Sequence, residues 1–176
     1  MTRPEGCGML DTGCLSPQFM PKITALIHTR NDARRIGRTL DSLRPCDEVL
    51  LIDSASDDDT AKIAREHGAN VKQAIVGVEP GAYAVDTLHD WVLCLLPGEA
   101  LSEGLEATLF EWKDTESDED TPGFAFSVRE DTGNGWKMCP LEMRLVNRNR
   151  TEWTGELPPN ADGAGELHGN LLRFRD

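Results

Sequence analysis

The sequence predicts an α/β fold: a mostly parallel sheet with helices on both faces and a small antiparallel addition toward the C-terminus. Up to residue 113, short apolar runs alternate with segments of helical spacing, which is typical of buried parallel strands joined by helices. Beyond Pro122, apolar and polar residues alternate one by one, as in antiparallel strands with one solvated face. These two patterns together define the fold class.

The first part of the chain contains four runs suited to strands, at residues 23–28, 48–53, 70–76 and 91–96, and the first two are typical of buried strands. A helix is expected between the first two runs, with Asn31-Asp32 near its start and Pro45 after its end. A second helix follows the second run and stops at Gly68, because glycine commonly terminates helices. A third helix has Ser102 as its cap. Residues 77–87 fit either a turn or one or two helical turns.

The remaining segments divide the chain into a leader and one domain. Residues 1–20 are rich in glycine, proline and small polar residues without periodicity, so a flexible leader is expected there. Residues 21–176 form a single domain in this interpretation, with an acidic stretch at 114–122 that is expected to be a solvated loop. Strands near 124–129 and 141–146, joined through a turn, and a last strand near 166–174 complete the domain.

The composition limits the classes of function. The 176 residues carry 31 acidic and 18 basic side chains, a net charge of −13, which argues against a nucleic-acid partner. The apolar runs stop far short of the roughly 20 residues that cross a bilayer, so no integral membrane segment is expected. The N-terminus lacks the apolar stretch of a secretory signal, and the five cysteines show no C-x-x-C spacing. We therefore expect a cytoplasmic protein with reduced thiols.

Polar residues follow three of the expected parallel strands, at 28–32, 53–56 and 96–99. Ligands of open α/β sheets collect at the carboxyl ends of the strands, so these segments are the candidate site. Asp53 is the sharpest candidate, because a carboxylate directly after an apolar strand can accept hydrogen bonds from a ribose hydroxyl or a base N–H. Capping of the following loop is an equally good interpretation of Asp53. The glycine-rich dinucleotide and P-loop motifs are absent from the sequence.

A set of short motifs spans roughly residues 22–157. ITALIHTRND at 23–32, LDSL at 40–43 and DEVLLIDSAS at 47–56 open the set, and Trp91-Val-Leu, Gly135-Trp136, residues 143–148 and residues 153–156 continue it. Together these motifs resemble those of family 2 glycosyltransferases, and most of all the lipopolysaccharide-core branch of that family. The resemblance is strongest at the beginning of this span.

The resemblance implies a GT-A fold, the nucleotide-sugar-binding fold of that family. It would make residues 21–113 the nucleotide-binding half and residues 123–176 an acceptor-side part. The residues that it places at the nucleotide are Thr29, Arg30, Asn31, Asp53 and Ser54. The expected partner is therefore a nucleotide or a nucleotide-sugar, with a homodimer or a second protein chain as a further option.

Three motifs of the family are altered in this sequence. The D-x-D motif, which holds Mg²⁺ or Mn²⁺ on the diphosphate, falls on Leu96 and Gly98, so that only the following Glu99 keeps a carboxylate. The K-N-x-A motif falls on residues 81–84 (GAYA), and the late His-Glu falls on Leu157-Pro158. No metal cofactor is therefore expected, and no catalytic residue is assigned.

Two main hypotheses follow from these alterations. The first is a glycosyltransferase-like protein with lost or metal-independent activity, in which Arg144, Arg148 or Arg30 neutralises the diphosphate in place of a metal. The alternative is a catalytically inactive GT-A scaffold that acts as a nucleotide-binding or protein-interaction module. A different small-ligand enzyme on the same scaffold is a weaker third hypothesis, because no cysteine–histidine pair carries a recognisable nucleophile motif.

Overall fold

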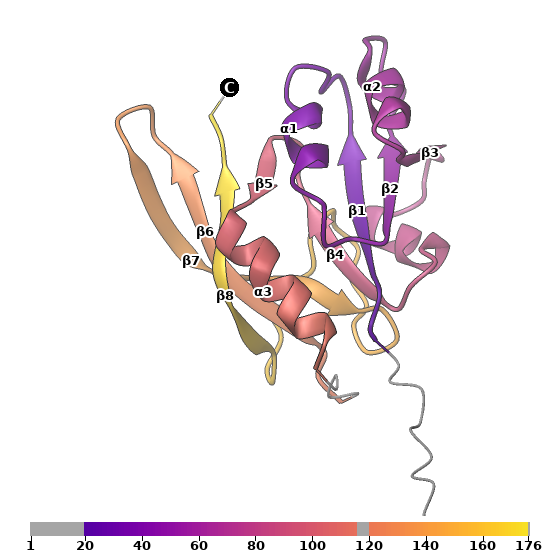
Figure 1. Ribbon diagram of the computed structural model, residues 1–176. Coiled ribbons are helices and arrows are strands. Elements are labelled where there is room, and N and C mark those ends of the chain that lie inside the picture. Colours follow the sequence, from indigo (N-terminus) through magenta and orange to yellow (C-terminus); the bar gives the residue numbers. More distant parts are fainter. Residues whose placement is uncertain (1–19, 116–119, 176) are drawn as a thin grey trace, which may run out of the picture.

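The computed structural model describes residues 20–115 and 120–175, and over these residues one eight-stranded sheet runs in the order β3-β2-β1-β4-β7-β6-β8-β5 (Figure 1). The strands are β1 (Ile23–Thr29), β2 (Glu48–Asp53), β3 (Asn70–Gln73), β4 (Trp91–Leu95), β5 (Glu99–Leu101), β6 (Gly123–Asp131), β7 (Trp136–Asn147) and β8 (Gly165–Arg173). The helices are α1 (Ile36–Asp41), α2 (Thr60–Glu66), the 3₁₀ helix η1 (Pro80–Asp86) and α3 (Glu103–Lys113). Nearly all of the expected leader and the middle of the acidic stretch lie outside the described residues.

The first half of the sheet is parallel and corresponds to the four predicted strands, of which β3 is shorter than expected and partly exposed. β1 lies between β2 and β4, with Thr29 opposite Asp53 and Ile27 opposite Leu95. All seven residues of β1 are buried, because it is a central strand covered on both faces. Since parallel strands end at the same edge of a sheet, this register brings the ends of β1, β2 and β4 together.

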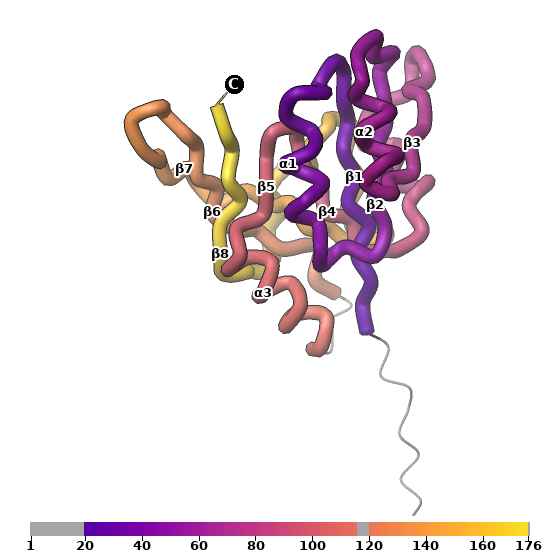
Figure 2. The backbone as a smooth tube through the Cα atoms, turned by 45° about the horizontal axis from the view of Figure 1, so that its top comes forward, coloured from indigo at the N-terminus to yellow at the C-terminus, as the bar shows by residue number. Residues whose placement is uncertain are grey.

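The second half is more extensive than the small addition that the sequence predicts. β7 pairs antiparallel with both β4 and β6, and β8 then pairs parallel with β6 and antiparallel with β5. Figure 2 shows how the β6–β7 hairpin turns away from the parallel half, while the end of β8 returns to β5. β5 was not expected from the sequence, because three residues are too short for a recognisable pattern.

The two faces of the sheet are covered differently. The α-helices of the described residues, α1, α2 and α3, all contribute to the core on one face, through side chains such as Ile36, Ala64 and Leu105. The other core is closed by Tyr83 of η1 and by the irregular segment 153–164. The sequence predicts helices on both faces of the sheet. In the described residues, one face carries the three α-helices and the other carries the 3₁₀ helix.

Close backbone packing at Gly81 holds η1 against the segment that follows β7. A Cβ atom on Gly81 would lie 1.9 Å from the carbonyl oxygen of Trp153, so only glycine fits there. The Gly81 N–H in turn donates to the carbonyl of Thr154. The stretch where the resembling family has K-N-x-A is thus used for a backbone contact. No helix in the described part of the chain has the length and apolarity needed to cross a bilayer.

Candidate functional site

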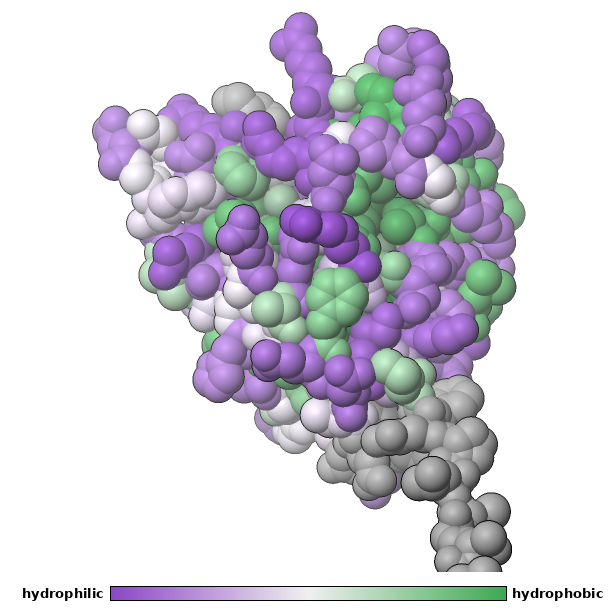
Figure 3. Space-filling view, in the orientation of Figure 1, coloured by the Kyte–Doolittle hydropathy of each residue, from purple (hydrophilic) through white to green (hydrophobic). Residues whose placement is uncertain are grey.

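A cleft of about 980 Å³ opens at the carboxyl ends of β1, β2 and β4. Thr29 and Arg30 from the end of β1, Ser54 after β2 and Leu96 after β4 line one wall. The ends of β6 and β8 form the opposite wall. All three strand ends singled out in the sequence therefore meet at one hollow. In Figure 3 this upper end of the molecule is largely hydrophilic, as expected for a site that takes a polar ligand.

Asp53 is buried beneath this cleft and is held by its own loop. Its carboxylate accepts hydrogen bonds from the backbone N–H of Ser56 at 3.1 Å, from the Ser56 hydroxyl and from Nε2 of Gln73 at 3.1 Å. The Thr29 hydroxyl lies 3.5 Å from the same carboxylate. Asp53 is only 2% exposed and is not among the residues that line the cleft, whereas Ser54 is. Of the two interpretations of Asp53, this geometry favours capping of the loop.

Asn31 connects the two loops that form this wall. Its backbone N–H donates to the Ser56 hydroxyl at 2.9 Å, and its side-chain oxygen accepts from the backbone N–H of Asp57 at 2.9 Å. Asn31 has a positive φ of 59°, a conformation that asparagine tolerates better than most residues. Asn31 lines a neighbouring hollow rather than the cleft itself, so its role is to position the loops.

His28 lies in the cleft wall and belongs to the candidate segment 28–32, but sequence reasoning assigned it no role of its own. Its side chain is 7% exposed, and its Nε2 atom is buried without a hydrogen-bond partner among the described residues. Burial lowers the pKa of His28 to about 4, so the imidazole is neutral at pH 7. The Nε2 atom is enclosed within the protein, and the ring packs edge-on against Tyr83 with 5.9 Å between the ring centres, so His28 shapes the wall without presenting this nitrogen to the cleft. The available sequence clue was its position at the end of a buried strand.

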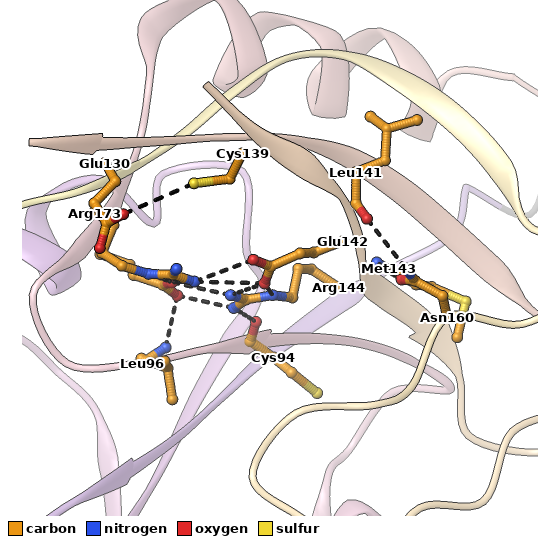
Figure 4. Close-up of polar contacts among 11 residues, drawn as sticks. Cys94, Leu96, Glu130, Cys139, Leu141, Glu142, Met143, Arg144, Asn160 and Arg173 are labelled. Atoms are coloured by element: carbon orange, nitrogen blue, oxygen red, sulfur yellow. Dashed lines mark hydrogen bonds and ion pairs between the residues drawn. The ribbon is translucent and has the colours of Figure 1, made fainter. Parts of the chain in front are cut away.

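A cluster of four charged side chains adjoins the cleft, because two of its members, Glu99 and Arg173, line the hollow. Figure 4 shows how Glu142, Arg144 and Arg173 point toward one another. This buried quartet consists of Glu99, Glu142, Arg144 and Arg173. Arg144 donates to both oxygens of Glu99, at 2.8 and 2.9 Å, and to Glu142 at 2.6 Å. Arg173 donates to Glu99 at 2.9 and 3.0 Å. Both oxygens of Glu99 are therefore engaged by guanidinium groups.

The quartet balances two carboxylates against two guanidinium groups in a poorly solvated place. Burial by itself would lower the pKa of Arg144, but the hydrogen bonds and charges of Glu99 and Glu142 outweigh it and raise that pKa. Glu99 and Arg144 are each 1% exposed. Arg173 is about 29% exposed and lines the cleft, so its guanidinium both belongs to the quartet and faces the open space.

The residues at the altered D-x-D motif do not fit a divalent metal ion. Glu99, the remaining carboxylate, is occupied by two arginines, and the backbone N–H of Leu96 also donates to it at 2.9 Å. Gly98 has a φ of +86°, and a Cβ atom there would lie 3.2 Å from the Cδ atom of Arg35. Within the described ranges, no group of three or more histidine, cysteine, aspartate or glutamate side chains could hold a metal.

The arginines that sequence reasoning assigned to the diphosphate occupy other places. Arg144 is fully paired inside the quartet, so its donors do not face the cleft. Arg148 lies in a separate hollow of about 540 Å³ beside Gly81, and its guanidinium is 3.0 Å from Asp90. These placements argue against a diphosphate contact for either residue. Arg30, the third candidate, does line the cleft.

Arg35, Arg173 and Arg175 line the cleft and were missed. Arg173 and Arg175 belong to the end of β8, which reaches the cleft only because β8 pairs with β5 and β6. Such long-range pairing leaves no local pattern in the sequence. The opposite wall also carries the carboxylates of Glu130, Asp131 and Glu156.

Cys94 does not supply a nucleophile. It is completely buried in β4, and burial raises the pKa of its thiol to about 12. Since the thiolate is the reactive form, this side chain is a small apolar group of the core at neutral pH. The geometry therefore gives no support to Cys94 as a catalytic nucleophile.

The sequence is similar to glycosyltransferases over about half of its length. It is 40% identical over 91 residues to an uncharacterised glycosyltransferase of Rickettsia felis, covering 49% of this chain and 32% of that protein. It is 38% identical over 96 residues to the uncharacterised glycosyltransferase RC0292 of Rickettsia conorii, covering 52% of this chain and 34% of the relative. The chain thus spans about a third of the length of these curated relatives. No family model matches the sequence.

The fold is that of GT-A glycosyltransferases. The crystal structure of residues 1–349 of S. aureus TarS superimposes with a TM-score of 0.51 at 19% identity, covering 65% of this chain and 37% of that TarS fragment. The complex of the same TarS fragment with UDP gives a TM-score of 0.50 at 18% identity, with the same coverage. Together with the related sequences, this confirms the GT-A fold that the family 2 motifs implied.

Proposed function

We propose that the cleft binds a nucleoside diphosphate sugar without a divalent metal, as the donor site of a glycosyltransferase. The observation that carries this proposal is the place of Arg173. Its guanidinium is held by Glu99, the one carboxylate left at the altered D-x-D motif, and it faces the cleft. A fixed positive charge thus stands next to the position where related enzymes would bind a metal ion.

The first wall of the cleft is suited to a nucleoside. Thr29 and Ser54 line it from the ends of β1 and β2, and both residue types exchange hydrogen bonds with sugar hydroxyls or base edges. Asp53 acts indirectly in this proposal, because it fixes the loop that carries Ser54.

The arginines of the cleft are suited to a diphosphate. The guanidinium groups of Arg30, Arg35, Arg173 and Arg175 come from both walls. A planar guanidinium can form two parallel hydrogen bonds to phosphate oxygens, and it stays charged at neutral pH. When the bond from the sugar to the diphosphate breaks, negative charge grows on the leaving diphosphate. Positioned positive charges stabilise that change without a metal.

Transfer also requires a base that takes the proton from an acceptor hydroxyl. Glu156 is exposed in the cleft wall, immediately before the position of the family's late His-Glu, and is the best placed carboxylate for this role. A second candidate function is an inactive nucleotide-binding scaffold. Leu157-Pro158 favours it, because neither side chain can move a proton.

Calorimetric titration tests the donor site. UDP, GDP, dTDP and CMP, each with a matching nucleotide-sugar, would be titrated in EDTA-containing buffer, and one nucleotide is expected to bind. Arg173→Gln should weaken that binding at least tenfold, since a hydrogen bond to a charged group contributes about 1.5–3 kcal/mol. Arg65→Gln, an exposed position on α2 outside the cleft, is the matched control and should bind like wild type.

Absence of binding across the panel, in protein shown to be folded by circular dichroism, would overturn the proposal. If Arg173→Gln loosens the quartet, Arg175→Gln provides a second test, because Arg175 is exposed and lies outside it. Slow release of nucleotide from the bound donor would indicate transfer to water and favour the enzyme. If no nucleotide is released, even when mixtures of acceptors are added, the inactive scaffold is favoured.

A further inference from the structure

A second hollow of about 500 Å³ opens beside the cleft, on the side of α1. The arginines that line it are Arg30, Arg34, Arg35, Arg38 and Arg175. These are five of the chain's 13 arginines, in a protein whose net charge is −13. They come from the loop after β1, from α1 and from the segment after β8, so the fold gathers them from distant parts of the sequence.

The two carboxylates in this hollow are already committed. Asp32 accepts hydrogen bonds from Nε of Arg35 at 2.7 Å and from the backbone N–H of Arg30 at 2.9 Å. Asp58 accepts from the backbone N–H groups of Ala33 and Thr60, and hydrogen bonds from Thr60 lower its pKa. The carboxylates of Asp32 and Asp58 thus make no ion pair with the other described arginines that line this hollow.

The other arginines have no carboxylate partner in the part of the chain that the structure describes. We call these four residues, Arg30, Arg34, Arg38 and Arg175, the rim arginines. The guanidinium of Arg38 lies 4.1 Å from the ring centre of Phe174, and Nη1 of Arg175 donates to the carbonyl of Thr132 at 3.4 Å. These contacts orient two of the groups but do not neutralise them.

Like charges gathered in one hollow repel one another, and their repulsion is relieved when an anion binds between them. Guanidinium groups from different segments can then contact several phosphate oxygens at once. The hollow is large enough for a phosphate group with part of the molecule that carries it. A carboxylate has two oxygens and one negative charge, so a phosphate fits four arginines better.

We propose that the rim arginines bind a phosphate group of the acceptor. Arg34 and Arg38 serve this phosphate alone, whereas Arg30 and Arg175 lie at the boundary and also face the donor diphosphate. This inference rests on the proposed function, because it assigns the neighbouring cleft to the donor. The hollow and the cleft share Arg30, Arg35, Phe174 and Arg175, so a molecule held by its phosphate in the hollow reaches the donor site. The acceptor class is then a phosphorylated sugar, either free or linked to a lipid through its phosphate.

The test uses phosphate-bearing probes and a double variant. Arg34 and Arg38 line the hollow but not the cleft, so Arg34→Gln/Arg38→Gln removes two charges from this site alone. Lys62→Gln/Arg65→Gln on α2 removes the same charge elsewhere and is the matched control. Titration with glucose 6-phosphate, with glucose as a blank, should show binding to wild type and control. It should weaken at least tenfold in the double variant.

The source of the phosphate is distinguished by a vesicle arm. Sedimentation with phosphatidylcholine vesicles containing 20 mol% phosphatidic acid, about a fifth of the lipid, should pull down wild type and control more than the double variant if the acceptor is lipid-linked. Binding of glucose 6-phosphate without vesicle binding identifies a free sugar phosphate. Vesicle binding alone identifies a lipid phosphate. Either result supports the inference, provided that the double variant no longer binds the probe that the wild type binds.

Three outcomes overturn the inference. The first is that neither probe binds to the wild type. The second is that the double variant and the control lose probe binding to the same extent. The third is full competition between glucose 6-phosphate and the nucleotide, since the hollow would then belong to the donor site. Nucleotide affinity of the double variant should stay within twofold of wild type. Failure of the donor proposal would appear as loss of nucleotide binding in wild type, with phosphate binding unaffected.

Discussion

The buried quartet and the rim arginines lie next to each other and use the same side chain in different ways. In the quartet, Arg144 and Arg173 are each held by carboxylates, and Arg144 is almost completely buried. The rim arginines are exposed and have no carboxylate partner among the described residues. The comparison shows that arginines near a cleft are not equivalent: a paired, buried guanidinium maintains the fold, and an unpaired one is open to a ligand. Arg173 belongs to the quartet and also reaches the cleft.

The largest effect is expected from breaking the quartet. Arg144→Met leaves Glu99 buried with half of its partners, and removing one member of a buried ion pair costs about 3–5 kcal/mol of unfolding free energy. Lys72→Met breaks the exposed pair with Asp86 and should cost less than about 1 kcal/mol. Urea denaturation measures both. Equal costs for the two variants would contradict the structural role assigned to the quartet.

The pH dependence of stability tests the burial of His28. The pKa of about 4 lies below the ordinary value of 6.5, so between these values the unfolded chain takes a proton that the folded chain does not. Stability should therefore fall as the pH decreases from 6.5 to 4, by up to about 3 kcal/mol from this group. His28→Gln should remove this part of the decline, and His168→Gln, at an exposed position, should not.

A flat profile in wild type over that range, measured by urea denaturation at several pH values, would show that His28 is not held in its neutral form. The same would follow if the exposed histidine variant lost the decline and His28→Gln kept it. Nucleotide binding should protect His28 further, because the ligand covers the cleft wall.

Restoring the metal motif should fail and should cost a smaller amount of stability. In Leu96→Asp/Gly98→Asp, the residue at 98 must adopt a φ of +86° and push against Arg35, so a loss of about 1–2 kcal/mol is expected. Mn²⁺ should not bind, because Glu99 stays paired with arginines. Gly37→Ala is a control at an ordinary φ inside α1, where it should stabilise by about 0.5–1 kcal/mol. Mn²⁺ binding by the double variant would contradict this account of the site.

The parallel half of the fold could be predicted from the sequence because its elements are local. The second strand spans Glu48–Asp53 as expected, and Ser102 caps α3 by accepting from the backbone N–H of Leu105. The fourth strand and the stop of α2 near Gly68 were also confirmed. Buried runs, caps and helix stops are encoded within a few residues, so pattern and propensity are sufficient to find them.

The antiparallel half and the arginines of the site could not be predicted in the same way. β8 reaches the cleft only through pairing with β5 and β6, and this pairing brings Arg173 to Glu99 across 74 positions of sequence. Arg144 was assigned to a ligand because its burial depends on the register of β7 against β4. Asp53 was found from the sequence, but its hydrogen bonds to Ser56 and Gln73 were not.

The metal dependence of nucleotide binding tests the central claim most directly. The nucleotide that binds in the calorimetric panel would be titrated again with Mn²⁺ and with EDTA, using the unmodified chain. If Arg173 and its neighbours take the place of a metal, the two Kd values should agree within about twofold, since a factor of two is under 0.5 kcal/mol. Tight binding that requires Mn²⁺ would contradict the claim, because it would show that a cation site exists despite Leu96, Gly98 and the pairing of Glu99.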